Sequence, residues 1–193
     1  IEEITRLMRE KKIEKEEIPD TLRDLLNGKI DQLGPARETA QLASVIGRRF
    51  DYNLIEKVSS KDTASLLADL DHLISAGIIH IQLVVGNPHY VFHHALVRDA
   101  AYESIDKISL MNNHRNIAHV IENYHTDLDP DKAWILAYHW SASQTYAKAL
   151  FWSLEAAQTF FQKTQFIESI NISKNAIPFC SHLPDKQKQI EYE

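Results

Sequence analysis

Apolar residues recur every three or four positions along most of the chain, and this spacing predicts a mainly helical protein. The clearest stripe lies in 61–76, where the apolar side chains would share one helix face. Its members are Leu66, Leu67, Leu70, Leu73 and Ile74. The same spacing, with residues that begin or end helices, predicts further helices over 1–17, 18–33, 36–47, 52–58, 95–105, 108–124, 130–143, 146–163 and 166–177.

The pattern changes between residues 78 and 92, where β-branched and aromatic residues replace the helical spacing. The segment 78–85 is apolar and β-branched, 86–88 (Gly-Asn-Pro) is a typical turn, and 90–92 is again β-prone. This arrangement predicts a β-hairpin. Three helices followed by a hairpin is the order of a winged-helix domain, with 86–88 at the tip of the wing.

Two histidines, His93 and His94, stand where the second strand of this hairpin runs into the next helix. In that helix Leu96, Ala100 and Ile105 are expected on or near one face. A histidine at such a junction can project towards whatever packs there. A half-buried histidine satisfied by its neighbours is the commoner role, so the residues alone leave both interpretations open.

The C-terminal helices carry small residues at the spacing of tetratricopeptide repeats, in which paired helices cross closely. Two sets fit offsets of 12 and 19 from the first member: Ala137, Ala149 and Ala156, and Ala157, Ser169 and Ala176. The sets overlap, so they cannot be two successive full repeats, and chance spacing of a common residue also remains open. We expect an antiparallel helical array with large aromatic residues at the helix contacts, namely Trp140, Trp152, Phe160 and Phe161.

The junction sequence FHHALVRDAAY (92–102) resembles the F-x-H-A-L-x-x-D-A-A-Y signature of STAND-class signalling ATPases. The similarity is to the segment that follows the ATPase core in bacterial proteins with adenylate or guanylate cyclase domains. The same residues also resemble the Met-His-Asp motif of plant and animal immune-receptor ATPases. On this alignment His94 is the motif histidine, and His93 fills a variable position.

Two flanking segments and one C-terminal segment extend the resemblance. IPDTLRDLLNGKIDQLGP (18–35) is similar to the family's I-P-x-T-L-x-x-L-L segment, and ASVIGRRF (43–50) is similar to A-A-V-I-G-R-x-F. ALFWSLEAAQTFFQKTQFIESI (149–170) resembles the degenerate first repeat that follows the winged helix. The resemblance implies a helical linker from the ATPase core over 1–34, a winged-helix domain over 35–107, and the start of tetratricopeptide-like repeats over 108–193.

The resemblance implies a regulatory and non-catalytic role. Such a segment couples the ADP or ATP state of an NTPase domain to an output domain, here a nucleotide cyclase. In the family the motif histidine touches the β-phosphate of ADP, so His94 is the expected nucleotide-sensing residue. The nucleotide, with Mg²⁺, would bind the NTPase domain of a longer parent protein, of which this chain is expected to be a fragment. The implied partners are that NTPase domain in cis and an unknown protein on the helical repeats.

Composition narrows the possible environments. No run approaches the roughly 18 apolar residues that a membrane span needs, and no signal-peptide pattern is present. The single cysteine, Cys180, suits a reducing compartment. We therefore expect a cytoplasmic protein without a membrane partner.

Catalytic and metal-binding patterns are not found in the sequence. Its 5 glycines form no phosphate-binding loop, so the chain should not hydrolyse ATP alone and needs no cofactor of its own. The 10 histidines lack cysteine partners or an HExxH pattern, so we expect no metal site. The carboxylates of Asp69 and Asp71 are expected on a solvated helix face rather than as an acid–base pair.

A second function class is a DNA-binding winged-helix regulator with a helical dimerisation or effector region. Its third helix would enter the major groove, but this one carries Asp62, Asp69 and Asp71 against Lys61 and His72. The net charge of −6 also repels a phosphate backbone. Arg48, Arg49 and Lys57 form a small basic patch elsewhere. Nucleic acid is thus not the expected partner, and salt dependence of duplex binding would distinguish the two classes.

Overall fold

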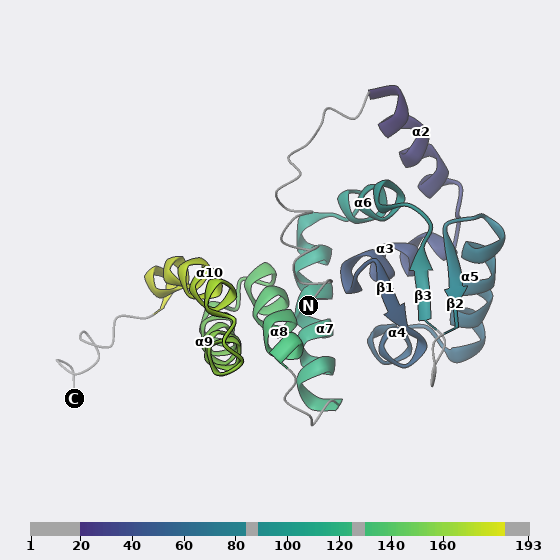
Figure 1. Ribbon diagram of the computed structural model, residues 1–193. Helices are drawn as coiled ribbons and strands as arrows, with labels where there is room; N and C mark the ends of the chain where they lie inside the picture. The colour runs from purple at the N-terminus through teal and green to yellow at the C-terminus, as the bar shows by residue number, and fades with distance from the viewer. Residues whose placement is uncertain (1–19, 84–88, 125–129, 184–193) are drawn as a thin grey trace, which may run out of the picture. The chain divides into compact units, whose positions relative to one another are not determined.

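The computed structural model describes residues 20–83, 89–124 and 130–183. In these ranges the chain is mainly helical and contains a small antiparallel sheet (Figure 1). It divides into two compact units, Ile1–Leu110 and Met111–Glu193, so the division falls within helix α7 (Lys107–Tyr124). The predicted helix over 1–17 and the predicted turn at 86–88 lie outside the described residues.

The helices of the first unit are α2 (Asp20–Asp31), α3 (Ala36–Ile46), α4 (Tyr52–Val58), α5 (Thr63–Ser75) and α6 (Ala95–Glu103). Their starts follow the capping rules, since Asp51 accepts a hydrogen bond from the backbone of Leu54 and Asp62 from that of Ser65. The bonds from Ser65 hold the pKa of Asp62 below its ordinary value. α5 therefore begins at Thr63, two residues after the predicted start, because Asp62 is its cap.

The sheet contains β1 (Arg49–Asp51), β2 (Ile79–Gln82) and β3 (His89–Phe92), in the order β1-β3-β2. The antiparallel pair β2–β3 confirms the predicted hairpin strands. A third strand, β1, was not predicted and pairs with the other edge of β3. β1 has three residues and one buried apolar side chain, Phe50, which is too short for an alternating pattern to be recognised.

The core of the first unit lies between the sheet and its helices. Phe50 stacks on Tyr90 with ring centroids 5.5 Å apart, and Phe92 is fully buried beside them. The turn after α2 adds Leu33, and the helices add Ile30, Ala36, Ala40, Ala43, Ile55, Leu66, Leu70, Leu73, Val97, Ala100 and Ala101.

Two apolar residues predicted on or near an apolar helix face are exposed, namely Leu67 and Leu96. In α6 the buried face begins one residue later, at Val97, and continues through Ala100 and Ala101. The physical reason is that each helix buries a narrower face than its apolar stripe, so residues at the edge of the stripe stay at the surface.

Asp69 corrects another prediction, because its carboxylate is buried rather than on a solvated face. Its Oδ2 atom lies 2.6 Å from Lys61 Nζ and also accepts a hydrogen bond from the buried Thr39 hydroxyl. Lys61 Nζ donates a further bond of 2.8 Å to the carbonyl of Pro35. One carboxylate thereby joins α3 to α5, whereas Asp71 is exposed as predicted.

The second unit contains most of α7, then α8 (Pro130–Ala142), α9 (Tyr146–Gln162), α10 (Phe166–Ala176) and the 3₁₀ helix η1 (Ile177–His182). α9 packs against both α8 and α10. Both predicted sets of small residues are buried there. The hydroxyl of Ser169 on α10 donates a bond of 2.8 Å to the carbonyl of Ala157 on α9, which places these helices in close contact.

The turns α8–α9 and α9–α10 have the same backbone geometry at an offset of 20 residues. Gln144 and Thr164 are both left-handed, with φ of 58° and 61°. The next residues, Thr145 and Gln165, have φ and ψ of −92° and 68°, and −93° and 68°. Their amides donate bonds of 2.9 Å to the carbonyls of Trp140 and Phe160, respectively.

Three of the four predicted contact aromatics are buried, namely Trp140, Trp152 and Phe160. Phe161 differs from them, because its side chain is 61% exposed and meets the Phe166 ring of α10 edge-on at the surface, with centroids 5.3 Å apart. Consecutive residues of a helix point about 100° apart, so Phe160 and Phe161 cannot both enter the same contact.

Replacing Asp69 by alanine should destabilise the first unit by about 1.5–3 kcal/mol, because Lys61 and Thr39 lose a shared charged partner. Asp71→Ala, on the exposed face of the same helix, should change stability by less than about 0.5 kcal/mol. Urea unfolding of both variants measures the difference. Equal effects would show that the buried contact contributes nothing specific.

Candidate functional site

The backbone around His94 is held by both neighbours of β3. The amide of Phe92 donates a bond of 3.0 Å to the carbonyl of Arg48, and the amide of His93 donates one of 3.0 Å to the carbonyl of Ile78. His94 follows as the N-cap residue of α6, and its carbonyl accepts bonds from Val97 and Arg98. The strand-to-helix junction is thus fixed immediately before and after His94.

Helix α6 is also attached to α3 at both of its ends. Arg98 Nε donates a bond of 3.0 Å to the carbonyl of Ser44. At the other end Gln41 Nε2 donates to the carbonyl and hydroxyl oxygens of Ser104, over 3.2 and 2.9 Å. These contacts prevent α6, and with it the junction, from sliding along α3.

The His94 side chain is exposed and makes no capping hydrogen bond to α6. Its backbone is extended, with φ of −132° and ψ of 139°. The alternative of a half-buried histidine satisfied within the core therefore does not describe His94. The imidazole stands at the positive N-terminal end of α6, a position that favours a negatively charged group.

His93 and His80 extend the site. The ring of His93 lies 4.6 Å from that of His80 on β2 and 6.4 Å from that of His94, centroid to centroid. His80 Nδ1 is buried without a hydrogen-bond partner. The pKa of His93 is lowered, first by desolvation and then by the neighbouring His80, His94 and Lys29.

His80 was missed by sequence reasoning, although pairing 78–85 with 90–92 in register would have placed it beside the junction. His89, which is close to His93 in sequence, lies at the opposite end of β3. In the part of the chain that the structure describes, no three or more metal-ligating side chains come together.

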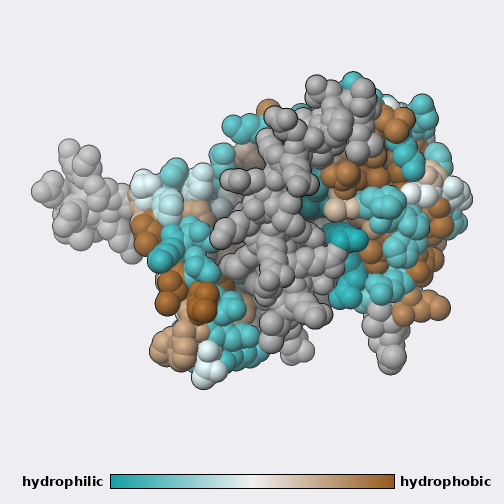
Figure 2. All heavy atoms as spheres, turned by 45° about the horizontal axis from the view of Figure 1, so that its top comes forward, coloured by the Kyte–Doolittle hydropathy of each residue, from teal (hydrophilic) through white to brown (hydrophobic). Residues whose placement is uncertain are grey.

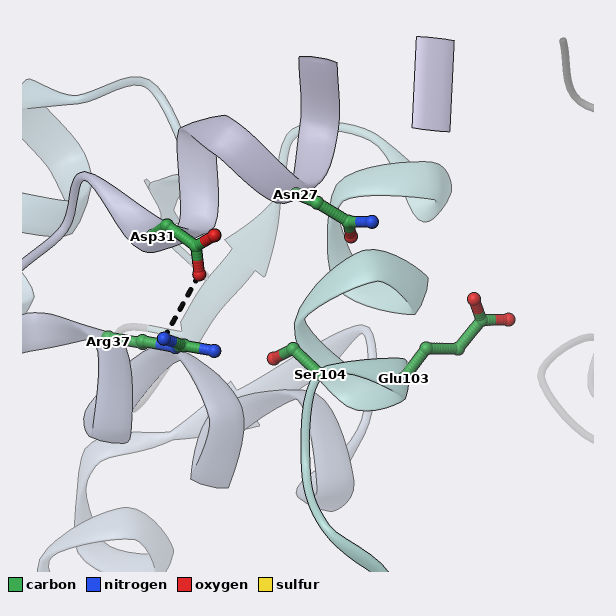
Figure 3. Close-up of a pocket in the computed structure, with 5 residues that line it drawn as sticks. All are labelled: Asn27, Asp31, Arg37, Glu103 and Ser104. Carbon is green, nitrogen blue, oxygen red and sulfur yellow. Dashed lines mark ion pairs between the residues drawn. The ribbon is translucent and has the colours of Figure 1, made fainter. Parts of the chain in front are cut away.

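A polar pocket of about 300 Å³ lies between α2, α3 and α6, and it too was not predicted. Arg37 Nη1 pairs with Asp31 over 3.0 Å at its wall (Figure 3). The Ser104 hydroxyl points towards the guanidinium, whereas the Glu103 carboxylate points away from it (Figure 3). The one guanidinium is already paired with Asp31, and Glu103 adds a second carboxylate to the lining, so the pocket has no excess positive charge to hold a phosphate.

The second unit contains a buried histidine pair and an apolar groove. Nδ1 of His114 on α7 lies 2.8 Å from Nδ1 of His139 on α8, so one ring donates and the other accepts. Between α9 and α10 a groove of about 430 Å³ is lined mainly by apolar side chains, including Leu150, Leu154, Ile170 and Ile177. Hydrophobic residues reach the surface over these C-terminal helices (Figure 2).

Comparison with known protein families finds none that matches the chain, and a search of curated proteins likewise finds no match. None of the helices in the described ranges is both long enough and apolar enough to cross a membrane.

The lowered pKa of His93 predicts a loss of stability in mild acid. Below its ordinary value of 6.5 the unfolded chain binds more protons at this position than the folded chain, so stability falls as the pH falls. His93→Asn should reduce the stability lost between about pH 7.5 and about pH 5.5. Thermal unfolding at both pH values measures this loss.

The matched control is His72→Asn, which removes an exposed histidine on α5. Asp62 and Asp106 do not interfere, because their pKa values are lowered from 3.8 and their contributions are lost only in stronger acid. An unchanged acid dependence in His93→Asn would contradict the prediction.

Proposed function

We propose that the chain is a non-catalytic regulatory segment of a STAND-type signalling ATPase. It couples the nucleotide state of an NTPase domain in the parent protein to an output domain, which the resemblance identifies as a nucleotide cyclase. The observation that carries the proposal is the geometry of His94. The exposed imidazole stands on a backbone held from both sides, at the N-terminus of a helix anchored to α3.

The order of elements supports a winged-helix interpretation of the first unit. α3, β1, α4, α5 and the β2–β3 hairpin follow one another in that order, and the hairpin leads directly into the junction. In the proposed resting state ADP lies between the NTPase core and this domain. His94 then donates a hydrogen bond to the β-phosphate and holds the closed form.

The second unit is proposed as the start of a tetratricopeptide-like array that binds a protein partner. Two features support this interpretation: buried small residues at the spacing of such repeats, and two turns of equal geometry. The exposed apolar residues of α9 and α10 would lie on its contact surface.

The DNA-binding alternative is less favoured by the contacts of α5. The helix itself, TASLLADLDHLIS, contains neither lysine nor arginine. Lys61, which stands just before it, is bound to Asp69 and to the carbonyl of Pro35. A helix that reads DNA needs such cations free for phosphates and base edges.

His94→Ala in the parent protein should weaken ADP binding tenfold to a hundredfold and raise basal signalling output. The lost bond is charge-assisted and contributes about 1.5–3 kcal/mol, and about 1.4 kcal/mol corresponds to a factor of ten. Calorimetry with ADP and an assay of output activity test the two effects. In the present chain the same variant should hardly change the melting temperature, because the imidazole is exposed.

His93→Ala is the control at about pH 8, where the imidazole is neutral, and it should alter neither ADP affinity nor output. Unchanged ADP affinity in His94→Ala, together with a markedly lower melting temperature, would show that His94 has only a structural role.

The exposed apolar face of α9 and α10 predicts weak, reversible self-association at millimolar concentration. Ile170→Ser combined with Leu154→Ser should abolish it, because both side chains line the groove and are 51% and 56% exposed. Leu25→Ser is the control, since Leu25 is 69% exposed but lies in the first unit. A strictly monomeric wild-type chain in sedimentation experiments at this concentration would refute the prediction.

A further inference from the structure

The three imidazoles at the junction come from three different places in the first unit. His80 lies on β2, His93 follows β3, and His94 caps α6. The rings of His80 and His93 are 4.6 Å apart, close enough that two protonated rings would repel strongly. The side chain of His80 is partly buried, and its Nδ1 atom is buried without a hydrogen-bond partner.

The groups that act electrostatically on His93 are His80, His94 and Lys29 on α2. All three are basic, so a proton on His93 meets positive charge and desolvation rather than a compensating carboxylate. Desolvation and then these basic neighbours disfavour the charged form of His93 and lower the pKa of its ring.

A bound anion at this position would instead favour the protonated form of His93. Phosphate oxygens accept charge-assisted hydrogen bonds and offset the repulsion between neighbouring imidazoles. The N-terminus of α6 beside His94 favours the same ligand. The terminal phosphates of a nucleotide carry several acceptor oxygens, and the rings of His93 and His94, with centroids 6.4 Å apart, lie together at the N-terminus of α6.

We propose that His93, backed by His80, takes up a proton from solution when the phosphates of a nucleotide bind at His94, so that the site retains its ligand more tightly in mild acid. This inference rests on the proposed function, because it assigns a regulation to the same phosphate site. No covalent bond changes: neutral His93 and one solvent proton give the imidazolium, which releases the proton when the ligand leaves.

Because one proton is taken up together with the ligand, the affinity for the ligand depends on pH. Between the titration midpoints of the empty and the occupied site, affinity should change by up to about tenfold for each pH unit. His80→Asn should weaken the pH dependence, because the empty site would then resist the proton less.

The test uses the whole chain with inorganic pyrophosphate as the probe. Imidazole proton resonances are followed by NMR from about pH 5.5 to about pH 8, with and without pyrophosphate. We expect the titration midpoint of His93 to rise when pyrophosphate binds, and the dissociation constant at about pH 6 to be severalfold smaller than at about pH 7.5. His93→Asn should remove this difference in affinity between the two pH values.

His72→Asn is the matched control, an exposed histidine of α5 outside the cluster, and it should keep the wild-type pH dependence. If His94 responds to pyrophosphate while His93 does not, and His93→Asn binds with an unchanged pH dependence, the inference is overturned and the proposed function stands. A response lost equally in His72→Asn would mark general charge attraction and also overturn it. Failure of the proposed function shows separately, as unchanged ADP affinity in the parent His94→Ala variant.

Discussion

Strand β3 is hydrogen-bonded along both edges, and the arrangement of the first unit depends on this constraint. A middle strand cannot shift towards one neighbour without breaking bonds to the other. The last residues of β3 are held in turn by Arg48 on one side and Ile78 on the other. The side chain of Phe92, the last residue of β3, is fully buried in the core. The chain therefore leaves the sheet at one place and in one direction, and α6 begins there.

Helix α3 performs the corresponding role among the helices. Its buried positions are mostly small, with Ala36, Ala40 and Ala43, which lets neighbouring helices approach closely. It contacts α2, α4, α5 and α6, and polar bonds supplement the apolar contacts at its ends and middle. Thr39 bonds to Asp69, Gln41 to Ser104, and the carbonyl of Ser44 to Arg98. These hydrogen bonds are directional, so they fix the positions of α5 and α6 against α3. Burial of apolar surface is non-directional and could not do this alone.

The helices were predictable because apolar periodicity and capping residues act locally. α4 was predicted with its observed bounds, and α7 to α10 within one residue at each end. Features that need two or more elements were not predictable. Strand β1 exists only because β3 pairs with it, the burial of Asp69 depends on Thr39 and Lys61, and the position of His80 beside His93 depends on the strand register. The junction at His94 was found from a resemblance of its sequence, whereas the pocket at Arg37 left no local signal.

The two equal turns of the second unit have a consequence for how freely its helices can vary in sequence. Because the geometry repeats after one helix rather than after a pair, α9 is the second member of one pair and the first member of the next. Lys148 and Trp152 bond to Glu122 of α7, and Ala157 receives the bond from Ser169 of α10. A helix that contacts several neighbours has few positions at which a substitution would leave its contacts unchanged. α9 should therefore evolve more slowly than α10, most of whose apolar residues are still open to solvent.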